Sequence, residues 1–180
     1  MADRNMPTPE NEAEALAERM GVLAAEVGAA LQVRNSTLAT AESCTGGWVG
    51  EVITSVAGSS AWFERGFITY SNESKTELLG VPEATLARYG AVSEQSARAM
   101  VEGAIARSRA DIALAVTGIA GPGGGAPGKP VGLVWFAWAE RGREARALQC
   151  VFRGDRQFVR AQAVVQALQG LLKLLQERGE

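Results

Sequence analysis

Two hydroxyls and a thiol stand side by side at Ser43, Cys44 and Thr45. An apolar segment over residues 37–41 predicts a strand before them, and apolar spacing predicts a helix over residues 48–56. A strand end that leads through small polar residues into a helix places nucleophiles beside free backbone N–H groups. Amide hydrolysis needs a nucleophile, a base and oxyanion donors. The same residues also suit a helix cap in which nothing reacts, and this stretch alone fits both interpretations.

The choice of base is narrowed by the absence of histidine from the sequence. That absence excludes a Ser-His-Asp triad, a Cys-His pair and every histidine-based metal site, which leaves a carboxylate, a tyrosine or a lysine. The chain has three lysines against fifteen arginines, and Lys75 falls in the first turn of a predicted short helix that ends at Gly80. Burial and a helix N-terminus both lower the pKa of a lysine amine, whereas arginine keeps its proton. Lys75 is therefore the candidate base, because Ser–Lys pairs are a known solution.

Neighbouring residues supply the alternatives and the remaining parts of a site. Cys44 is the rival nucleophile, but it has no histidine to activate it, and a buried cysteine is usually inert. Tyr70 is the next candidate for the base. The backbone N–H groups of Thr45, Gly46 and Gly47 are the expected oxyanion donors, each worth ~3 kcal/mol.

A glycine-rich segment, TGIAGPGGGAPGKPVG at residues 117–132, follows a strand expected over residues 111–117. That strand is apolar on both faces, which predicts a central strand covered by helices. The segment matches neither the P-loop nor the dinucleotide-binding pattern, and its spacing fits a flexible connector as well as a ligand loop. Its position after a central strand favours the ligand loop. The candidate substrate-binding residues are Thr117, Gly118, Gly121 and Gly123.

Strands and helices alternate along the predicted chain. Helices are expected over residues 11–34, 48–56 and 93–108, with two short helices closed by Gly80 and Gly90 and a last helix capped by Asp155. Strands are expected over residues 37–41, 62–70, 111–117, 133–140 and 144–152. This order predicts a three-layer α/β/α domain at residues 11–180 with a mixed, mostly parallel sheet, after a disordered tail at residues 1–10. Ligands gather at strand carboxyl ends, so the candidate residues should share one rim.

The composition indicates a globular protein and limits its partners. The chain has 180 residues, 47% of them hydrophobic, and its formal charge of −2 gives no electrostatic footprint for nucleic acid. No apolar run reaches membrane-spanning length and the N-terminus is unlike a signal peptide, so we expect a cytoplasmic protein without a membrane partner. Cys44 and Cys150 have neither metal-binding nor redox spacing, and we expect both to be reduced. We expect no metal and no cofactor, and a homo-oligomer is left open.

Three long motifs carry a family resemblance. They are AESCTGGWVGEVITSVAGSSAWFERGFITYSNESK at residues 41–75, VTGIAGPGGG at residues 116–125 and FRGDRQFVRAQAVVQALQGL at residues 152–171. Together they resemble the CinA C-terminal domain family of nicotinamide-nucleotide amidohydrolases. The resemblance implies an α/β/α fold and, in pyridine nucleotide recycling, hydrolysis of the carboxamide of nicotinamide mononucleotide to nicotinate mononucleotide and ammonia. It also implies a metal-free mechanism with Ser43 as nucleophile, Lys75 as base, and Tyr70 and Thr117 as neighbours.

This substrate agrees with the chemistry of the residues. Its pyridinium withdraws electrons from the carboxamide and eases attack by a modest nucleophile. Its 5′-phosphate suits the N–H groups of a glycine loop or helix N-terminus, and Arg153 and Arg156 are further candidates. Two other interpretations stay open: a non-catalytic nucleotide-binding module of the same fold, and an amidase with a different substrate. Many family members carry an N-terminal domain linked with ADP-ribose pyrophosphatase activity. We expect neither this domain nor this activity in this chain.

Overall fold

The computed structural model describes residues 9–177, which contain one five-stranded sheet. Its strands are β1 (Leu38–Glu42), β2 (Phe63–Ile68), β3 (Ile112–Gly118), β4 (Leu133–Glu140) and β5 (Arg146–Val151). They lie in the order β2-β1-β3-β4-β5, with β1 parallel to β2 and β3, and with β4 antiparallel to both of its neighbours. Four strands therefore run in one direction and β4 in the other, which confirms the mixed, mostly parallel sheet.

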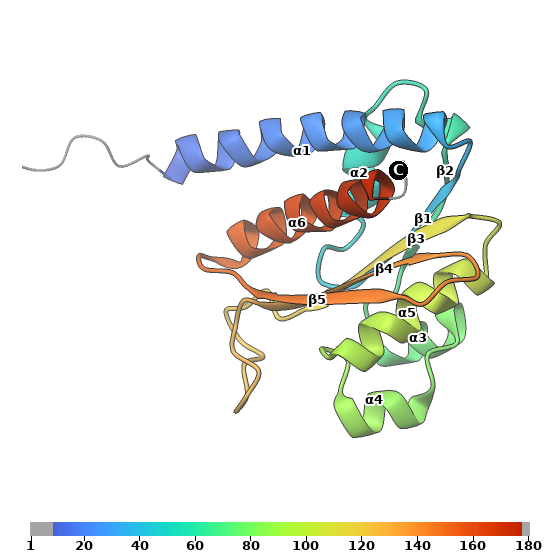
Figure 1. The fold of residues 1–180 in the computed structure, drawn as a ribbon. Helices are drawn as coiled ribbons and strands as arrows, with labels where there is room; N and C mark the ends of the chain where they lie inside the picture. The colour runs from blue at the N-terminus through green and yellow to red at the C-terminus, as the bar shows by residue number, and fades with distance from the viewer. Residues whose placement is uncertain (1–8, 178–180) are drawn as a thin grey trace, which may run out of the picture.

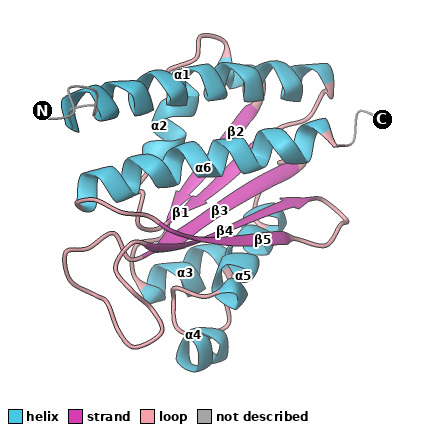
Figure 2. Cartoon of the chain, turned by 60° about the vertical axis from the view of Figure 1, so that its left-hand side comes forward, coloured by secondary structure: helices cyan, strands magenta, loops and turns pink. Residues whose placement is uncertain are grey.

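Helices cover both faces of this sheet, as Figures 1 and 2 show. One layer consists of α1 (Pro9–Val33), α2 (Trp48–Thr54) and α6 (Arg156–Gln176). The other consists of α3 (Asn72–Leu79), α4 (Glu83–Tyr89) and α5 (Glu94–Ala106). A short 3-10 turn, η1 (Ser59–Ala61), precedes β2. The predicted three-layer α/β/α architecture is confirmed.

The core consists of two apolar clusters, one on each face of the sheet. Strand β3 supplies both, because successive side chains of a strand point to opposite faces. Its isoleucine, leucine and valine pack with α1 and α6, whereas its alanines pack with α5. The same alternation on β1 places Glu42 on the face of Leu38, the face that α2 covers. A carboxylate therefore lies beneath α2 at the end of β1, directly before Ser43.

Capping side chains mark several helix starts. Ser93 accepts an N–H from the first turn of α5, and Asp155 accepts one from the first turn of α6, which confirms the predicted Asp155 cap. Ser71 caps α3 by accepting the Ser74 N–H, and the Ser74 hydroxyl accepts the Ser71 N–H to complete a capping box. Pro82 stands just before α4 rather than inside its first turn. The start of the helix that carries Lys75 is thus held by two reciprocal side-chain contacts.

Several helix boundaries differ by one or two residues from those expected, and α5 ends at Ala106 instead of residue 108. Helix α1 starts at Pro9, so residues 9 and 10 belong to a helix, and the rest of the predicted tail lies outside the described residues. Helix α2 ends at Thr54 instead of residue 56, because the chain tightens there: the Val56 N–H donates to the Ile53 carbonyl, three residues back. Among residues 9–177, no helix combines the length and apolar character needed to cross a membrane.

Candidate active site

Ser43 and Lys75, far apart in the sequence, meet at the carboxyl ends of the parallel strands. Ser43 directly follows β1, and its backbone N–H donates to the Val116 carbonyl on β3 at 2.9 Å. Lys75 lies in α3, and its side chain extends back toward the helix N-terminus, the direction in which helical side chains lean. Lys75 Nζ lies 3.1 Å from Ser43 Oγ. The structure therefore places the predicted nucleophile and base within hydrogen-bond distance.

The Lys75 amine is buried among carbonyl groups. The residue is 1% exposed, and its Nζ donates to the Thr69 carbonyl at 2.8 Å and to the Tyr70 and Ser71 carbonyls at 3.5 Å each. No carboxylate of the described residues forms an ion pair with it, and burial lowers its pKa below the ordinary value. A neutral amine has two N–H groups for these carbonyls and one lone pair left for the proton of the Ser43 hydroxyl. The arrangement suits a general base.

The neighbouring thiol is poorly suited to attack. Cys44 is buried, and this burial is the largest cause of a rise in its pKa to about 12. The thiolate is the reactive form of cysteine, so near neutral pH Cys44 stays protonated and weakly nucleophilic. Between the two adjacent candidates, the structure favours the Ser43 hydroxyl.

Glu42 changes the expected use of the α2 N-terminus. This carboxylate is 1% exposed and accepts hydrogen bonds from the N–H groups of Gly47, Val49 and Gly50 at 3.1, 3.0 and 2.8 Å. The Gly46 N–H donates to the Ser43 carbonyl. The prediction that Gly46 and Gly47 offer free N–H donors is therefore wrong, because both groups already have acceptors. The sequence did hold a signal for this contact, because Glu42 is an acidic residue at an inward-facing position of its strand.

Thr45 is the third of the predicted oxyanion donors. Among residues 9–177 no acceptor contacts its N–H, and its buried hydroxyl also lacks a partner. The residue is completely enclosed, however, so a substrate oxygen does not reach it in this conformation. Its substrate-binding role stays a prediction that requires the turn to open.

The Tyr70 side chain is exposed and contacts Arg156. It is 61% exposed, and its hydroxyl accepts a hydrogen bond from Arg156 Nη2 at 2.9 Å. Its backbone carbonyl, in contrast, faces Lys75 Nζ. Arg156 Nη1 also donates to the Gly121 carbonyl at 2.9 Å, so this arginine ties the end of the β2 segment to the glycine-rich loop. Tyr70 thus borders the site through its backbone and forms part of its rim through its hydroxyl.

The other candidates of the glycine-rich segment have structural contacts of their own. The buried Thr117 hydroxyl donates to the Ala91 carbonyl at 2.8 Å, which ties β3 to the loop before α5. A Cβ at Gly118 would lie 2.8 Å from the Leu133 carbonyl oxygen, so close strand packing requires glycine there. Gly121 has a φ of 82° and contacts Arg156, and Gly123 is exposed. Of these four predicted residues, Gly121 is the one that a hydrogen bond links to the Tyr70 rim.

Besides Glu42, Arg160 on α6 is a residue near Ser43 that was not predicted from the sequence. Its guanidinium donates to the carbonyls of Cys44 and Thr45 and lies over the Trp48 ring. It falls four residues after Arg156, one helical turn away, so the two arginines share a face of α6. This spacing of four residues was the feature of the sequence that could have indicated Arg160. The turn that carries Ser43 is therefore contacted from a helix in the distant C-terminal part of the chain.

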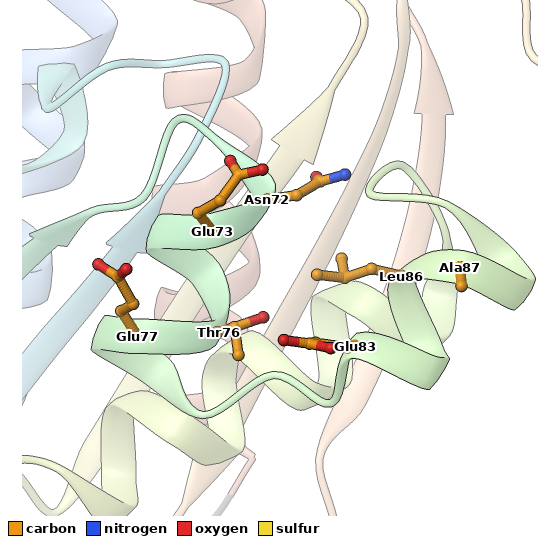
Figure 3. A pocket seen from close by; sticks show the side chains of 7 residues that line it. All are labelled: Asn72, Glu73, Thr76, Glu77, Glu83, Leu86 and Ala87. Carbon is orange, nitrogen blue, oxygen red and sulfur yellow. The ribbon is translucent and has the colours of Figure 1, made fainter.

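A pocket of about 390 Å³ lies between α3 and α4 (Figure 3). Asn72 and Thr76 on α3 point toward Glu83 and Leu86 on α4, whereas Glu73 and Glu77 also line the pocket but do not point toward α4. The acidic lining makes this pocket unsuitable for a phosphate group. Ser43 and Lys75 are not among its lining residues, so the pocket is separate from the candidate active site.

Comparison with known proteins adds an independent line of argument. A family model described as the CinA C-terminal domain matches residues 21–175. The chain belongs to the CinA C-terminal domain family. The family resemblance expected from the three sequence motifs is thereby confirmed.

Two named proteins and one solved structure are similar to most of this chain. The chain is 57% identical to nicotinamide-nucleotide amidohydrolase PncC of Escherichia coli K12 over 150 residues, 83% of this chain and 90% of that protein. It is 53% identical to PncC of Pseudomonas putida over 152 residues, 84% of this chain and 94% of that one. The crystal structure of competence/damage inducible protein CihA from Agrobacterium tumefaciens superposes with a TM-score of 0.85 at 43% identity, covering 87% of this chain and 95% of that one.

Proposed function

We propose that this protein hydrolyses the carboxamide of nicotinamide mononucleotide to nicotinate mononucleotide and ammonia, in the recycling of pyridine nucleotides in the cytoplasm. The observation that carries the proposal is the 3.1 Å distance between Ser43 Oγ and the buried Lys75 Nζ. The substrate is inferred from the relatives named nicotinamide-nucleotide amidohydrolase, which match most of the chain. A Ser–Lys pair supplies both a nucleophile and a base without histidine.

The proposed reaction proceeds through an ester on Ser43. The Ser43 oxygen attacks the carboxamide carbon while the neutral Lys75 amine takes the hydroxyl proton. The ammonium that forms is held by the carbonyls of Thr69, Tyr70 and Ser71, which stabilise its charge. Lys75 then passes the proton to the departing nitrogen, so that ammonia leaves and the acyl group stays on Ser43. Lys75 then takes a proton from a water molecule whose oxygen attacks the ester carbon, and returns this proton to the Ser43 oxygen as the acyl bond breaks. This releases nicotinate mononucleotide and restores the Ser43 hydroxyl and the neutral Lys75 amine.

The substrate phosphate requires positive charge or free N–H groups near this pair. Arg156 is well placed among the predicted candidates, because it hydrogen-bonds the hydroxyl of Tyr70, whose neighbour Thr69 holds the Lys75 amine. An arginine fork also suits the planar geometry of a phosphate. We therefore assign the phosphate to the Arg156 side of the rim, with Arg153 and the N–H groups around Gly121 as additional contacts.

A substrate panel tests this function. Purified protein is given nicotinamide, nicotinamide riboside and nicotinamide mononucleotide, and ammonia release is measured for each. We expect the mononucleotide to have the highest kcat/KM, because it alone carries the phosphate. Hydrolysis of a different amide in preference would indicate another amidase. No ammonia from any amide would indicate a non-catalytic module of the same fold.

A further inference from the structure

Arg160 on α6 reaches the turn that carries Ser43. Its Nε donates to the Cys44 carbonyl at 3.1 Å, and its Nη2 donates to the Thr45 carbonyl at 2.9 Å. These are the two carbonyl groups that directly follow the serine. We infer, resting on the proposed role of Ser43 as nucleophile, that Arg160 is a positioning residue that holds Ser43 Oγ against Lys75.

The guanidinium fixes two successive peptide planes. In a trans peptide the C=O of one residue and the N–H of the next point in opposite directions. With the Cys44 and Thr45 carbonyls directed at Arg160, the following two N–H groups turn away from it. The second of these, the Gly46 N–H, reaches the Ser43 carbonyl at 3.0 Å. The turn after Ser43 is therefore held by a cation on one side and by its own hydrogen bond on the other.

The chain on the other side of Ser43 is fixed by different contacts. The Ser43 N–H donates to the Val116 carbonyl on β3 at 2.9 Å. The carboxylate of Glu42 accepts three N–H groups from α2 and its preceding residue. Without Arg160 the serine keeps these contacts but loses the tether that joins its turn to α6. Because a misplacement of ~1 Å can cost ~10²-fold in rate, loss of one tether should be visible in catalysis.

Arginine is specifically suited to this position. Its planar fork presents parallel N–H groups that match two neighbouring carbonyls, whereas a lysine ammonium is a single point donor. The guanidinium carbon lies 5.3 Å from the centroid of the Trp48 ring, which orients the fork. Two of its N–H groups are occupied by the turn, so Arg160 acts here on the backbone and not as a free cation. It therefore differs from Arg156, whose guanidinium contacts the Tyr70 rim.

Conservative variants of Arg160 test the inference. Arg160→Lys keeps the charge and Arg160→Gln keeps a polar end, and both are compared with Arg88→Lys. Arg88 is a matched control, because it also lies over an aromatic ring, Tyr89, but is exposed on α4 in the other layer. We measure kcat and KM for nicotinamide mononucleotide, the melting temperature, and the rate at which a fluorophosphonate labels Ser43. The labelling rate reports the reactivity of the serine without any amide substrate.

We expect kcat to fall by ~10–100-fold in both Arg160 variants with KM nearly unchanged, and labelling to slow by a similar factor. Arg88→Lys should match the wild type. A lower melting temperature with wild-type kcat and labelling would overturn the inference, as would failure of both variants to fold. A raised KM with unchanged kcat would instead make Arg160 a substrate contact. If the wild type does not hydrolyse the mononucleotide but labelling still slows, the proposed function fails and the positioning role stands.

Discussion

Lys75→Arg is the substitution that separates proton transfer from simple positive charge. The variant keeps a cation at the site, but an arginine cannot accept the serine proton. General base catalysis contributes ~10²–10⁴-fold, so kcat/KM should fall by about that factor, which is ~3–5 kcal/mol of activation free energy. Lys75→Ala should lose activity to a similar extent. If Lys75 only bound the phosphate, Lys75→Arg would instead keep most of kcat and change KM.

The same substitution has a cost in stability that can be stated in advance. Lys75 is 1% exposed, so the larger guanidinium has to fit into a filled space. Overpacking of this kind costs ~1–3 kcal/mol. For a domain of this size each kcal/mol lowers the melting temperature by ~2–4 °C, so a moderate fall is expected while the protein stays folded at assay temperature. Lys173→Arg is the matched control, because Lys173 is exposed on α6.

The assay is ammonia release from nicotinamide mononucleotide across a range of pH, with the melting temperature measured in parallel. Lys75 must be neutral to accept a proton, so kcat/KM of the wild type should rise with pH through the pKa of this amine. Burial lowers that pKa, so the acid limb should lie below the ordinary ~10.4. A primary amine such as propylamine should partly restore Lys75→Ala. An active Lys75→Arg with an unchanged acid limb would refute the pairing and leave Tyr70 as the next candidate.

Cys44→Ala should keep most of its activity, because a thiol with a pKa of about 12 stays protonated; a folded but inactive variant would assign the nucleophile to the thiol. Activity should persist after exhaustive chelation, since the proposed steps use only Ser43 and Lys75, and loss restored by one divalent ion would contradict this. Glu42→Gln should lower the free energy of unfolding in urea by ~1–3 kcal/mol, because its new NH₂ group faces an N–H donor. Equal losses in Glu42→Gln and in the exposed control Glu51→Gln would contradict that explanation.

The sequence predicted the parts of this site that depend on local pattern. The strand before Ser43 and the helix that carries Lys75 each follow from apolar spacing and end signals. Parallel strands bring their carboxyl ends to one edge, so the meeting of these two residues followed from topology. The proposed chemistry of the pair is indicated by composition, because a chain without histidine leaves a carboxylate, a tyrosine or a lysine as the base. Asp155 was also recognisable as a cap from residue type and position.

Contacts between a side chain and a distant backbone were not predictable in this way. Arg160 contacts Cys44 and Thr45 across more than a hundred residues of sequence, and only the packing of α6 beside α2 brings them together. Glu42 was missed for a different reason: a helix N-terminus looks like a free anion site until a buried carboxylate is seen to occupy it. Sequence patterns indicate the periodicity of helices and strands and where these elements end. The contacts of Arg160 and Glu42 depend instead on the conformations of individual side chains in the packed structure.

The most direct test of the central claim is ammonia release from nicotinamide mononucleotide by Ser43→Ala beside the wild type. We expect the wild type to form one ammonia for each nicotinate mononucleotide. We expect Ser43→Ala to form none above background while melting cooperatively near the wild-type temperature. If Ser43 were merely a cap, its loss would cost only ~1 kcal/mol of stability and leave the rate intact. A Ser43→Ala protein that deamidates at the wild-type rate would contradict the assignment of Ser43 as the nucleophile.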